Sequence, residues 1–341
     1  MVTSKGASSV KADVSIVVCT YNRAQMLARA LESLVRQQTQ GEFTFEIVVV
    51  DDRSTDGTQV ALQNIAKDCQ VPIRCFRGEG RGIAAARNTG LGAASGEWLA
   101  FFDDDQVADP NWLKELHALA LKTRSQCVGG ARPLLLIAQE LSLLSPICRA
   151  ALGEITQGNE PRKCGRKQYP CTGNMLLRRS VFDQVGQFDE SLTRGGEDTE
   201  FGVRLRRAGI EAWFTPKAIV HHYVPAYRLN ESYLFWRALA CGSNFAYRDF
   251  QEWGLVRTVT ACLARIAQAS FINCPLMLLA YILGDRAELT GRKYLLLAAW
   301  GYLRESLYLV SPRLFSQETY FSHLSFRGER NAFAGSSKST D

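Results

Sequence analysis

Several features that would assign a chain to a familiar class are missing from these 341 residues. No apolar core follows the first residues, so we expect no signal peptide and take residues 1–12 as a disordered lead-in. No DNA- or RNA-reading motif accompanies the formal net charge of +6, so we expect no nucleic-acid partner. No internal repeat or low-complexity tract is present. The content of 46% hydrophobic and 22% charged residues is typical of a globular protein that buries a core.

The sequence has ten cysteines, but they are scattered. Cys164 and Cys171 lie close together, yet no second pair follows at the spacing of a zinc finger. Buried free thiols are therefore the favoured interpretation, and they suit a reducing cytosol.

Apolar runs alternate with helical patterns in the first third of the chain. The continuous run at residues 14–20 predicts a strand covered on both faces, and residues 26–35 carry an apolar stripe at helical spacing. Further strands are predicted at residues 45–52, 72–78 and 97–103, with helices at 58–67 and from 82 onward. This alternation predicts a doubly wound α/β domain.

Polar side chains follow three of these strands at the point where each strand ends. They are Thr20, Tyr21 and Asn22 after the first strand, Asp51 and Asp52 after the second, and Asp103, Asp104 and Asp105 after the fourth. Ligands of doubly wound sheets bind beyond the carboxyl ends of the strands. We therefore expect these groups to border one shared crevice.

The three consecutive aspartates at 103–105 suggest a divalent cation. Mg²⁺ and Mn²⁺ prefer oxygen ligands and commonly lie between one or two carboxylates and a diphosphate. Asp103 and Asp105 are spaced to serve one ion, while Asp104 would point elsewhere. The alternative is an acidic N-cap for the helix expected at residues 110–116, but Asp109 fits that role.

Four segments, at residues 14–23, 47–58, 82–105 and 195–209, resemble family 2 glycosyltransferases of the GT-A fold. The resemblance runs in order over residues 14–225. It implies a doubly wound mixed sheet with a Rossmann-like nucleotide-binding half and an acceptor half. It also implies an inverting transfer from a nucleotide sugar, usually a UDP-sugar, to a hydroxyl of a glycan or lipid-linked acceptor.

The resemblance also assigns roles to residues of the nucleotide-binding half. Those expected to bind the nucleotide sugar are Thr20, Tyr21, Arg23, Asp51, Asp52, Arg87, Asp103 and Asp104. Thr20, Tyr21 and Arg23 would line the nucleotide pocket, and Arg87 would approach the base and phosphates. Asp51 and Asp52 would contact the base or ribose. Asp103 and Asp105 would form the family's DxD element, which holds Mg²⁺ or Mn²⁺ on the diphosphate.

The acceptor half supplies the remaining assignments. Asp198 resembles the family's catalytic base, with Glu197 supporting substrate binding; the alternative is that both acids only stabilise the first turn of a helix. Gly173 and Asn174 would form a polar floor under the donor sugar. His222 resembles a histidine that completes the cation site in related enzymes, although such a residue can equally lie at a surface or hinge.

The last third of the chain differs in character. Residues 226–325 predict apolar helices, and 326–341 a disordered tail. From residue 226 onward we count thirteen Lys and Arg against nine Asp and Glu, a balance that favours an anionic membrane surface. Residues 266–284 and 294–310 could lie in the membrane interface, span the bilayer as a hairpin, or form a soluble helical subdomain. The sequence thus predicts a catalytic domain at 13–225 on the cytoplasmic face of a membrane.

Two other functions compete with this interpretation. A nucleotidyltransferase also uses a doubly wound sheet, acids and Mg²⁺, but it would carry a glycine-rich basic loop after the first strand. This chain has CTYNRAQ at residues 19–25 instead. A membrane-tethered nucleotide-sugar binder without activity is expected to have lost the acids at 103–105 or 197–198, and all of them are present.

Overall fold

The computed structural model describes residues 2–3, 11–67, 69–156, 158–165, 169–192 and 196–316. The chain divides into two compact units. The first unit comprises Met1–Pro133 and Ile155–Tyr223, and the second comprises Leu134–Glu154 and Val224–Asp341. The tail predicted at 326–341, and most of the predicted lead-in, lie outside the described residues.

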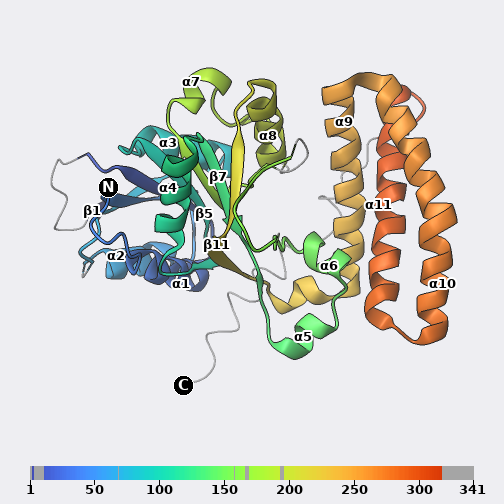
Figure 1. The fold of residues 1–341 in the computed structure, drawn as a ribbon, viewed down its shortest axis with the longest axis horizontal. Helices are drawn as coiled ribbons and strands as arrows, with labels where there is room; N and C mark the ends of the chain where they lie inside the picture. Colours follow the sequence, from blue (N-terminus) through green and yellow to red (C-terminus); the bar gives the residue numbers. More distant parts are fainter. Residues whose placement is uncertain are drawn as a thin grey trace. The chain divides into compact units, whose positions relative to one another are not determined.

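The first unit is built on a mixed β-sheet (Figure 1) with the strand order β1-β4-β3-β2-β5-β10-β7-β11-β6. The strands are β1 (Val2–Thr3), β2 (Val14–Thr20), β3 (Phe45–Asp51), β4 (Ile73–Arg77), β5 (Trp98–Asp103), β6 (Gln106–Ala108), β7 (Cys127–Ala131), β10 (Asn174–Arg178) and β11 (Ala212–Tyr223), with β9 (Arg162–Lys163) beside β11. Strands β4, β3, β2 and β5 are parallel, and β10 runs antiparallel between β5 and β7. The predicted doubly wound α/β sheet is therefore confirmed.

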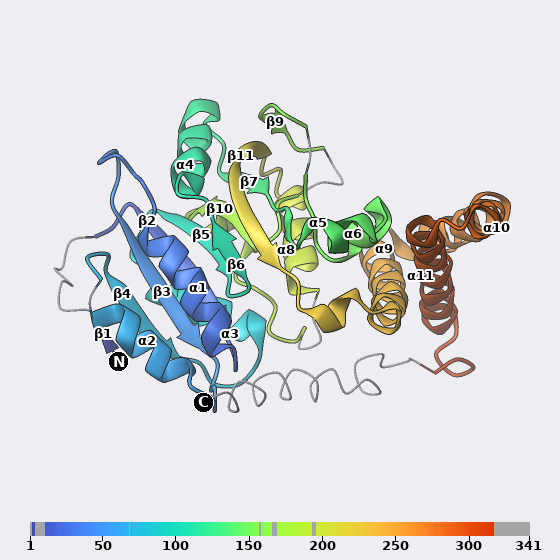
Figure 2. The same ribbon diagram turned by 90° about the horizontal axis from the view of Figure 1, so that it is seen from below.

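Helices cover both faces of this sheet (Figure 2). They are α1 (Ala24–Val35), α2 (Thr58–Lys67), α3 (Ile83–Ala93), α4 (Trp112–Thr123), α7 (Val181–Val185) and α8 (Glu197–Arg207). Alternate residues of β2 point to opposite faces, so Ile16 belongs to the core cluster that includes α1, α2 and α4, while Val17 belongs to the cluster that includes α3, α7 and α8. Burial on both faces explains why the strand sequence is continuously apolar.

The register of the parallel strands brings their polar ends together. Thr20 at the end of β2 lies opposite Asp51 at the end of β3. On the other side of β2, Cys19 lies opposite Asp103 at the end of β5. The polar residues that follow these strands therefore share one edge of the sheet.

The second unit is helical, as the sequence predicts for the C-terminal region. It contains β8 (Leu134–Leu135), α5 (Ala138–Ser142), α6 (Pro146–Ala151), η1 (Ala226–Leu229), α9 (Glu231–Gln268), η2 (Ala269–Asn273), α10 (Cys274–Leu283) and α11 (Arg286–Val310). Gly254 breaks α9 with φ 76° and ψ 177°, which only glycine adopts readily. The chain turns back at Gly254 and again at Gly284, so that the segments at 231–253, 255–283 and 286–310 form antiparallel arms (Figure 1).

The outer surface of the arm at 255–283 is apolar. Among the described residues, one helix, Glu231–Leu283, is long and apolar enough to cross a membrane, and only 11% of its most apolar window is buried. Large apolar side chains that are at least half exposed on this arm are Val256, Leu263, Phe271, Ile272, Leu278, Tyr281, Ile282 and Leu283. Length and composition alone are weak grounds for a membrane span.

Close packing between the arms depends on glycine. A Cβ on Gly301 of α11 would lie 2.3 Å from the carbonyl oxygen of Leu239 on α9, a distance that neither backbone can accept. We expect Gly301→Ala to destabilise the second unit by about 1–3 kcal/mol, the usual cost of overpacking. Gly92→Ala on α3 is the control, because no atom lies within 4 Å of its added Cβ. Circular dichroism melts should show a lower midpoint for Gly301→Ala alone, and equal midpoints would contradict this packing.

Candidate active site

The two acids after β3 shape the neighbouring loops. Asp51 accepts hydrogen bonds from the backbone N–H of Ser54 at 2.9 Å and from Nε2 of Gln59 at 3.1 Å. Asp52 accepts from the backbone N–H groups of Gly80 and Gly82, at 2.8 Å and 3.0 Å. A cavity of about 220 Å³ lies beside Asp51 and is lined by Asp51, Gln59, Leu62, Gln63, Cys75, Phe76 and Arg77. Asp52 thus holds the loop at residues 78–82 in place, while Asp51 borders a cavity.

The loop after β2 contacts the acids that follow β5. Thr20 Oγ1 donates a hydrogen bond to Asp104 at 2.8 Å. Arg23 Nη1 lies 2.6 Å from Asp104 Oδ1 and 3.2 Å from Asp105 Oδ2. Burial raises the pKa of the Asp104 carboxyl, and the charge of Arg23 opposes this shift. Tyr21 in the same loop is 43% exposed.

Strand β11 brings His222 to the same acids. The backbone N–H of Tyr223 donates to the carbonyl of Asp105 at 2.8 Å, which holds the end of β11 beside the segment that contains Asp105. His222 Nδ1 then lies 3.5 Å from Asp105 Oδ1, and both side chains are buried. The structure thus places His222 next to Asp105.

Arg87 on α3 joins the acids of the strand ends to those of α8. Its Nη1 lies 2.5 Å from Glu197 Oε1, and its Nη2 lies 3.5 Å from Asp103 Oδ1. Burial by itself would lower the pKa of Arg87, but the two carboxylates outweigh it and raise that pKa above its usual value. Burial also raises the pKa of Glu197, although Arg87 opposes this. The guanidinium group of Arg87 therefore stays charged and links the carboxylates of Asp103 and Glu197 within one site.

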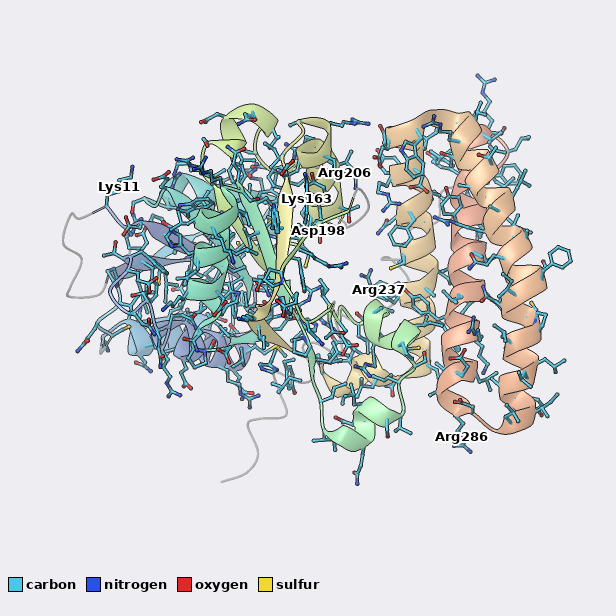
Figure 3. The ribbon with its side chains drawn as sticks, viewed as in Figure 1. Lys11, Lys163, Asp198, Arg206, Arg237 and Arg286 are labelled. Carbon is cyan, nitrogen blue, oxygen red and sulfur yellow. The ribbon has the colours of Figure 1, made fainter. Side chains whose placement is uncertain are left out.

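Asp198 stands beside Glu197 at the start of α8, and Figure 3 labels its position. Gly196 precedes the helix with φ 94°, a conformation that favours glycine. Gly195 lies outside the described residues. Asp198 Oδ1 accepts from the backbone N–H of Thr199 at 2.7 Å, and its side chain remains partly exposed. Its carboxylate is thus close to the Arg87–Glu197 pair and open to a ligand.

Gly173 and Asn174 have different surroundings. A Cβ on Gly173 would lie 2.5 Å from Asp103 Oδ2, so this residue borders the acids. Asn174 is instead 1% exposed and accepts from Trp112 Nε1 at 2.8 Å. Its Nδ2 donates to the carbonyls of Ala131 and Ala218, at 2.9 Å and 3.0 Å. These contacts turn the Asn174 amide into the protein interior, so they do not support the predicted sugar floor at this residue.

The expected N-cap of α4 was also wrong. The N-cap residue is Asn111, and its side chain makes no capping hydrogen bond. Asp109 accepts instead from the backbone N–H of Asn111 at 2.9 Å, two residues along the chain. A short Asx turn therefore precedes the helix where the sequence suggested a cap.

Asp103, Asp105 and His222 could supply some, but not all, of the ligands that a divalent cation needs. Within the described ranges, no group of three His, Cys, Asp or Glu side chains is already arranged around a metal position. Asp103 is 31% exposed at its side chain, while Asp105 and His222 are buried beside one another. Carboxylate ligands suit both Mg²⁺ and Mn²⁺. Such a site fits an ion whose remaining ligands come from water and a bound diphosphate.

Sequence reasoning missed Gln106 and Arg132. Gln106 directly follows the aspartates, so its proximity in sequence was a usable signal. Arg132 follows β7 and gave no such signal, because its place beside the site depends on how β7 packs between β10 and β11. Both side chains border Gly173, because a Cβ added there would lie 2.6 Å from Gln106 Nε2 and 2.7 Å from Arg132 Nη1.

A mixed, doubly wound sheet with these acids at its carboxyl edge is the arrangement expected of a GT-A glycosyltransferase. The model of glycosyl transferase family 2 matches residues 15–186, about half of the chain. The chain belongs to this family.

Relatives with named roles support the same assignment. The chain is 29% identical over 241 residues to the succinoglycan biosynthesis protein ExoM of Rhizobium meliloti (strain 1021), covering 68% of this chain and 73% of that protein. It is 32% identical over 230 residues to validoxylamine A glucosyltransferase of Streptomyces hygroscopicus subsp. jinggangensis (strain 5008), covering 60% and 54% of the two chains. It covers only 38% of the chondroitin synthase of Escherichia coli, to which it is 27% identical over 267 residues.

A solved structure supports the fold. The mannosyltransferase PcManGT from Pyrobaculum calidifontis, in complex with GDP-Man and Mn²⁺, superposes with a TM-score of 0.56. The match covers 86% of this chain and 88% of that chain at 19% identity.

Proposed function

We propose that the protein is an inverting glycosyltransferase that moves a sugar from a nucleotide sugar to a hydroxyl of a glycan or lipid-linked acceptor. A UDP-sugar is the expected donor, and cell-surface polysaccharide or glycolipid synthesis the expected setting. The observation that carries the proposal is the bridge formed by Arg87. It links Asp103 at the end of β5 with Glu197 at the start of α8, so the donor-binding acids and the proposed base lie on one site.

The chain's own groups suit a nucleoside diphosphate. Asp51 borders the cavity proposed for the base or ribose, Thr20 lies opposite Asp51 in the sheet, and Tyr21 follows Thr20 along the chain. Arg23 and Arg87 supply positive charge next to the acids, where a diphosphate would need it. These contacts also support donor roles for Asp52 and Asp104 through the loops that they hold in place.

Asp103, Asp105 and His222 are the residues proposed to hold Mg²⁺ or Mn²⁺. When bound, the ion would act as a Lewis acid that stabilises the negative charge developing on the leaving diphosphate. Asp105 and His222 are already in contact, whereas Asp103 borders solvent, so the site is open on the side of the donor.

Asp198 is the proposed catalytic base. An acceptor hydroxyl must lose its proton as it attacks the anomeric carbon, and a carboxylate within hydrogen-bond reach can accept it. Attack on the face opposite the diphosphate inverts the anomeric configuration. Glu197 is held by Arg87, which leaves the partly exposed Asp198 as the acid available to the acceptor.

A panel of donors tests the proposal. The protein is incubated with Mn²⁺ and UDP-, GDP- and dTDP-sugars, and release of free nucleoside diphosphate is followed. We expect release from one donor class and its loss when EDTA removes the ion. Binding of a donor without release under any condition would favour the inactive binder, and absence of binding by every donor would contradict the proposal.

The second unit is proposed to bind the membrane surface on the cytoplasmic face. The support is the exposed apolar surface of the arm at 255–283, where Phe271, Ile282 and Leu283 are each more than two-thirds exposed. Burying such side chains in the interface would contribute up to about 1.5–3 kcal/mol each.

Replacing Phe271, Ile282 and Leu283 together by Ser should therefore weaken binding to phosphatidylglycerol-containing vesicles by more than tenfold. Val60→Ser on α2 is the control, because Val60 is exposed to a similar degree on the first unit. Vesicle co-sedimentation measures both variants. Equal pelleting of the triple variant and the parent protein would contradict the proposed membrane binding.

A further inference from the structure

Gln106 is a buried amide without a hydrogen bond. It opens β6, where it lies opposite His222 of β11, and its residue is only 1% exposed. Within the part of the chain that the structure describes, neither Oε1 nor Nε2 has a hydrogen-bond partner. Leaving a buried polar group unsatisfied costs about 1–3 kcal/mol, so such a group calls for an explanation.

The surroundings of Gln106 are polar on several sides. A Cβ added to Gly173 would lie 2.5 Å from Asp103 Oδ2, 2.6 Å from Gln106 Nε2 and 2.7 Å from Arg132 Nη1. These side chains come from β5, β6 and the residue after β7, and they approach Gly173 more closely than a residue with a side chain would allow. We call Asp103, Gln106 and Arg132 around Gly173 the Gly173 subsite.

Arg132 belongs to the electrostatic environment of the active site. Burial by itself would lower its pKa, but its neighbours outweigh this effect and raise it. The neighbours responsible are Cys171, Asp103, Asp105 and Asp198. The guanidinium charge of Arg132 therefore acts on both the strand-end acids and the proposed base.

The chemistry of the Gly173 subsite selects its occupant. Asp103 accepts hydrogen bonds, Arg132 donates them, and the Gln106 amide can do both. A phosphate oxygen in this place would face the Asp103 carboxylate, and a cation would face the Arg132 guanidinium. A hydroxyl suits all of these neighbours, because it can donate to Asp103 while it accepts from Arg132 or Gln106.

We propose that the Gly173 subsite binds a hydroxyl of the transferred sugar, and that Gln106 is a specificity-determining residue for the donor. This rests on the proposed function. A site built to hydrogen-bond a substrate hydroxyl rejects the analogue that lacks it, because its buried polar groups are then left unpaired. The amide of Gln106 is thus unsatisfied in the free protein and satisfied when the donor sugar is in place.

Gln106→Met tests the proposal, since methionine keeps the length of the side chain and removes the amide. Calorimetry on the full chain with Mn²⁺ compares two probes: the donor that gives turnover in the panel and the matching free nucleoside diphosphate. We expect the affinity for the nucleotide sugar to fall about three- to tenfold and that for the diphosphate to stay unchanged. Monodeoxy analogues of the donor then identify the hydroxyl, because one analogue should bind Gln106→Met and the parent protein equally.

Gln126→Met is the matched control, because Gln126 precedes β7 at the opposite end from Arg132. The melting temperature of Gln106→Met should equal or exceed that of the parent protein, because the substitution removes an unsatisfied buried group. Unchanged affinity for both probes would overturn the proposal and leave Gln106 satisfied by a structural water only. Equal losses for both probes would overturn it as well, since the role would then lie in the diphosphate site. Failure of the parent protein to bind any nucleotide sugar would overturn the proposed function together with this inference.

Discussion

Replacing Asp198 by Asn lowers turnover by a factor on the order of a hundred or more and leaves donor affinity close to that of the parent protein. The amide is nearly isosteric with the carboxylate but cannot accept the proton of the acceptor hydroxyl. Glu197 stays paired with Arg87 in this variant, so the contacts proposed for the donor remain in place. Steady-state kinetics give the turnover, and calorimetry with the donor gives the affinity.

The control for this variant is Glu200→Gln, two residues further along α8. Glu200 Oε1 lies 2.7 Å from Arg204 Nε on the same helix, and both side chains are partly buried, so the substitution removes a carboxylate outside the proposed site. Turnover of this control should stay within about twofold of the parent protein, because the Glu200 carboxylate pairs with Arg204 and is not among the residues proposed to bind the ion, the donor or the acceptor. Full activity of Asp198→Asn would show that another group accepts the proton.

Replacing Asp105 by Ala reduces metal-dependent turnover by about a hundred- to a thousandfold and weakens donor binding. The variant removes one of the carboxylates proposed to hold the ion and leaves His222 without its neighbouring acid. Arg23 keeps its shorter contact with Asp104, so the loop after β2 should hold its position. Kinetics over a range of Mn²⁺ concentrations measure the loss, with circular dichroism as the check on folding.

Asp109→Ala is the matched control. Asp109 lies four residues after Asp105 and contacts only the turn before α4 through its side chain in the described structure. Its loss should leave the dependence of turnover on Mn²⁺ unchanged. A variant Asp105→Ala that retains that dependence at the parent level would place the ion elsewhere.

The edge of the sheet could be predicted from the sequence because its signals are local. A continuous apolar run followed by polar residues marks the end of a buried strand, and parallel strands end at the same edge. The structure pairs Thr20 with Asp51 and Cys19 with Asp103, which agrees with the shared edge expected from that pattern. The predicted α/β fold and the neighbourhood of its acids could therefore be inferred before the structure.

Contacts that depend on tertiary packing could not be inferred in this way. Asn174 follows Gly173 directly, yet it turns into the core because Trp112 and two backbone carbonyls need its amide. Arg132 reaches the site only because β7 lies between β10 and β11. Neither contact can be read from the residues adjacent in sequence, so the pattern did not indicate where the Asn174 side chain points and did not identify Arg132.

The central claim is that the acids at the strand ends and the corner at Glu197 and Asp198 form one donor site with a divalent ion. The most direct test is a crystal structure with Mn²⁺ and the nucleoside diphosphate of the active donor, with anomalous scattering recorded at the manganese edge. The account predicts one anomalous peak bordered by Asp103, Asp105 and the diphosphate. A peak remote from these carboxylates, or a diphosphate bound on another face of the sheet, would contradict it.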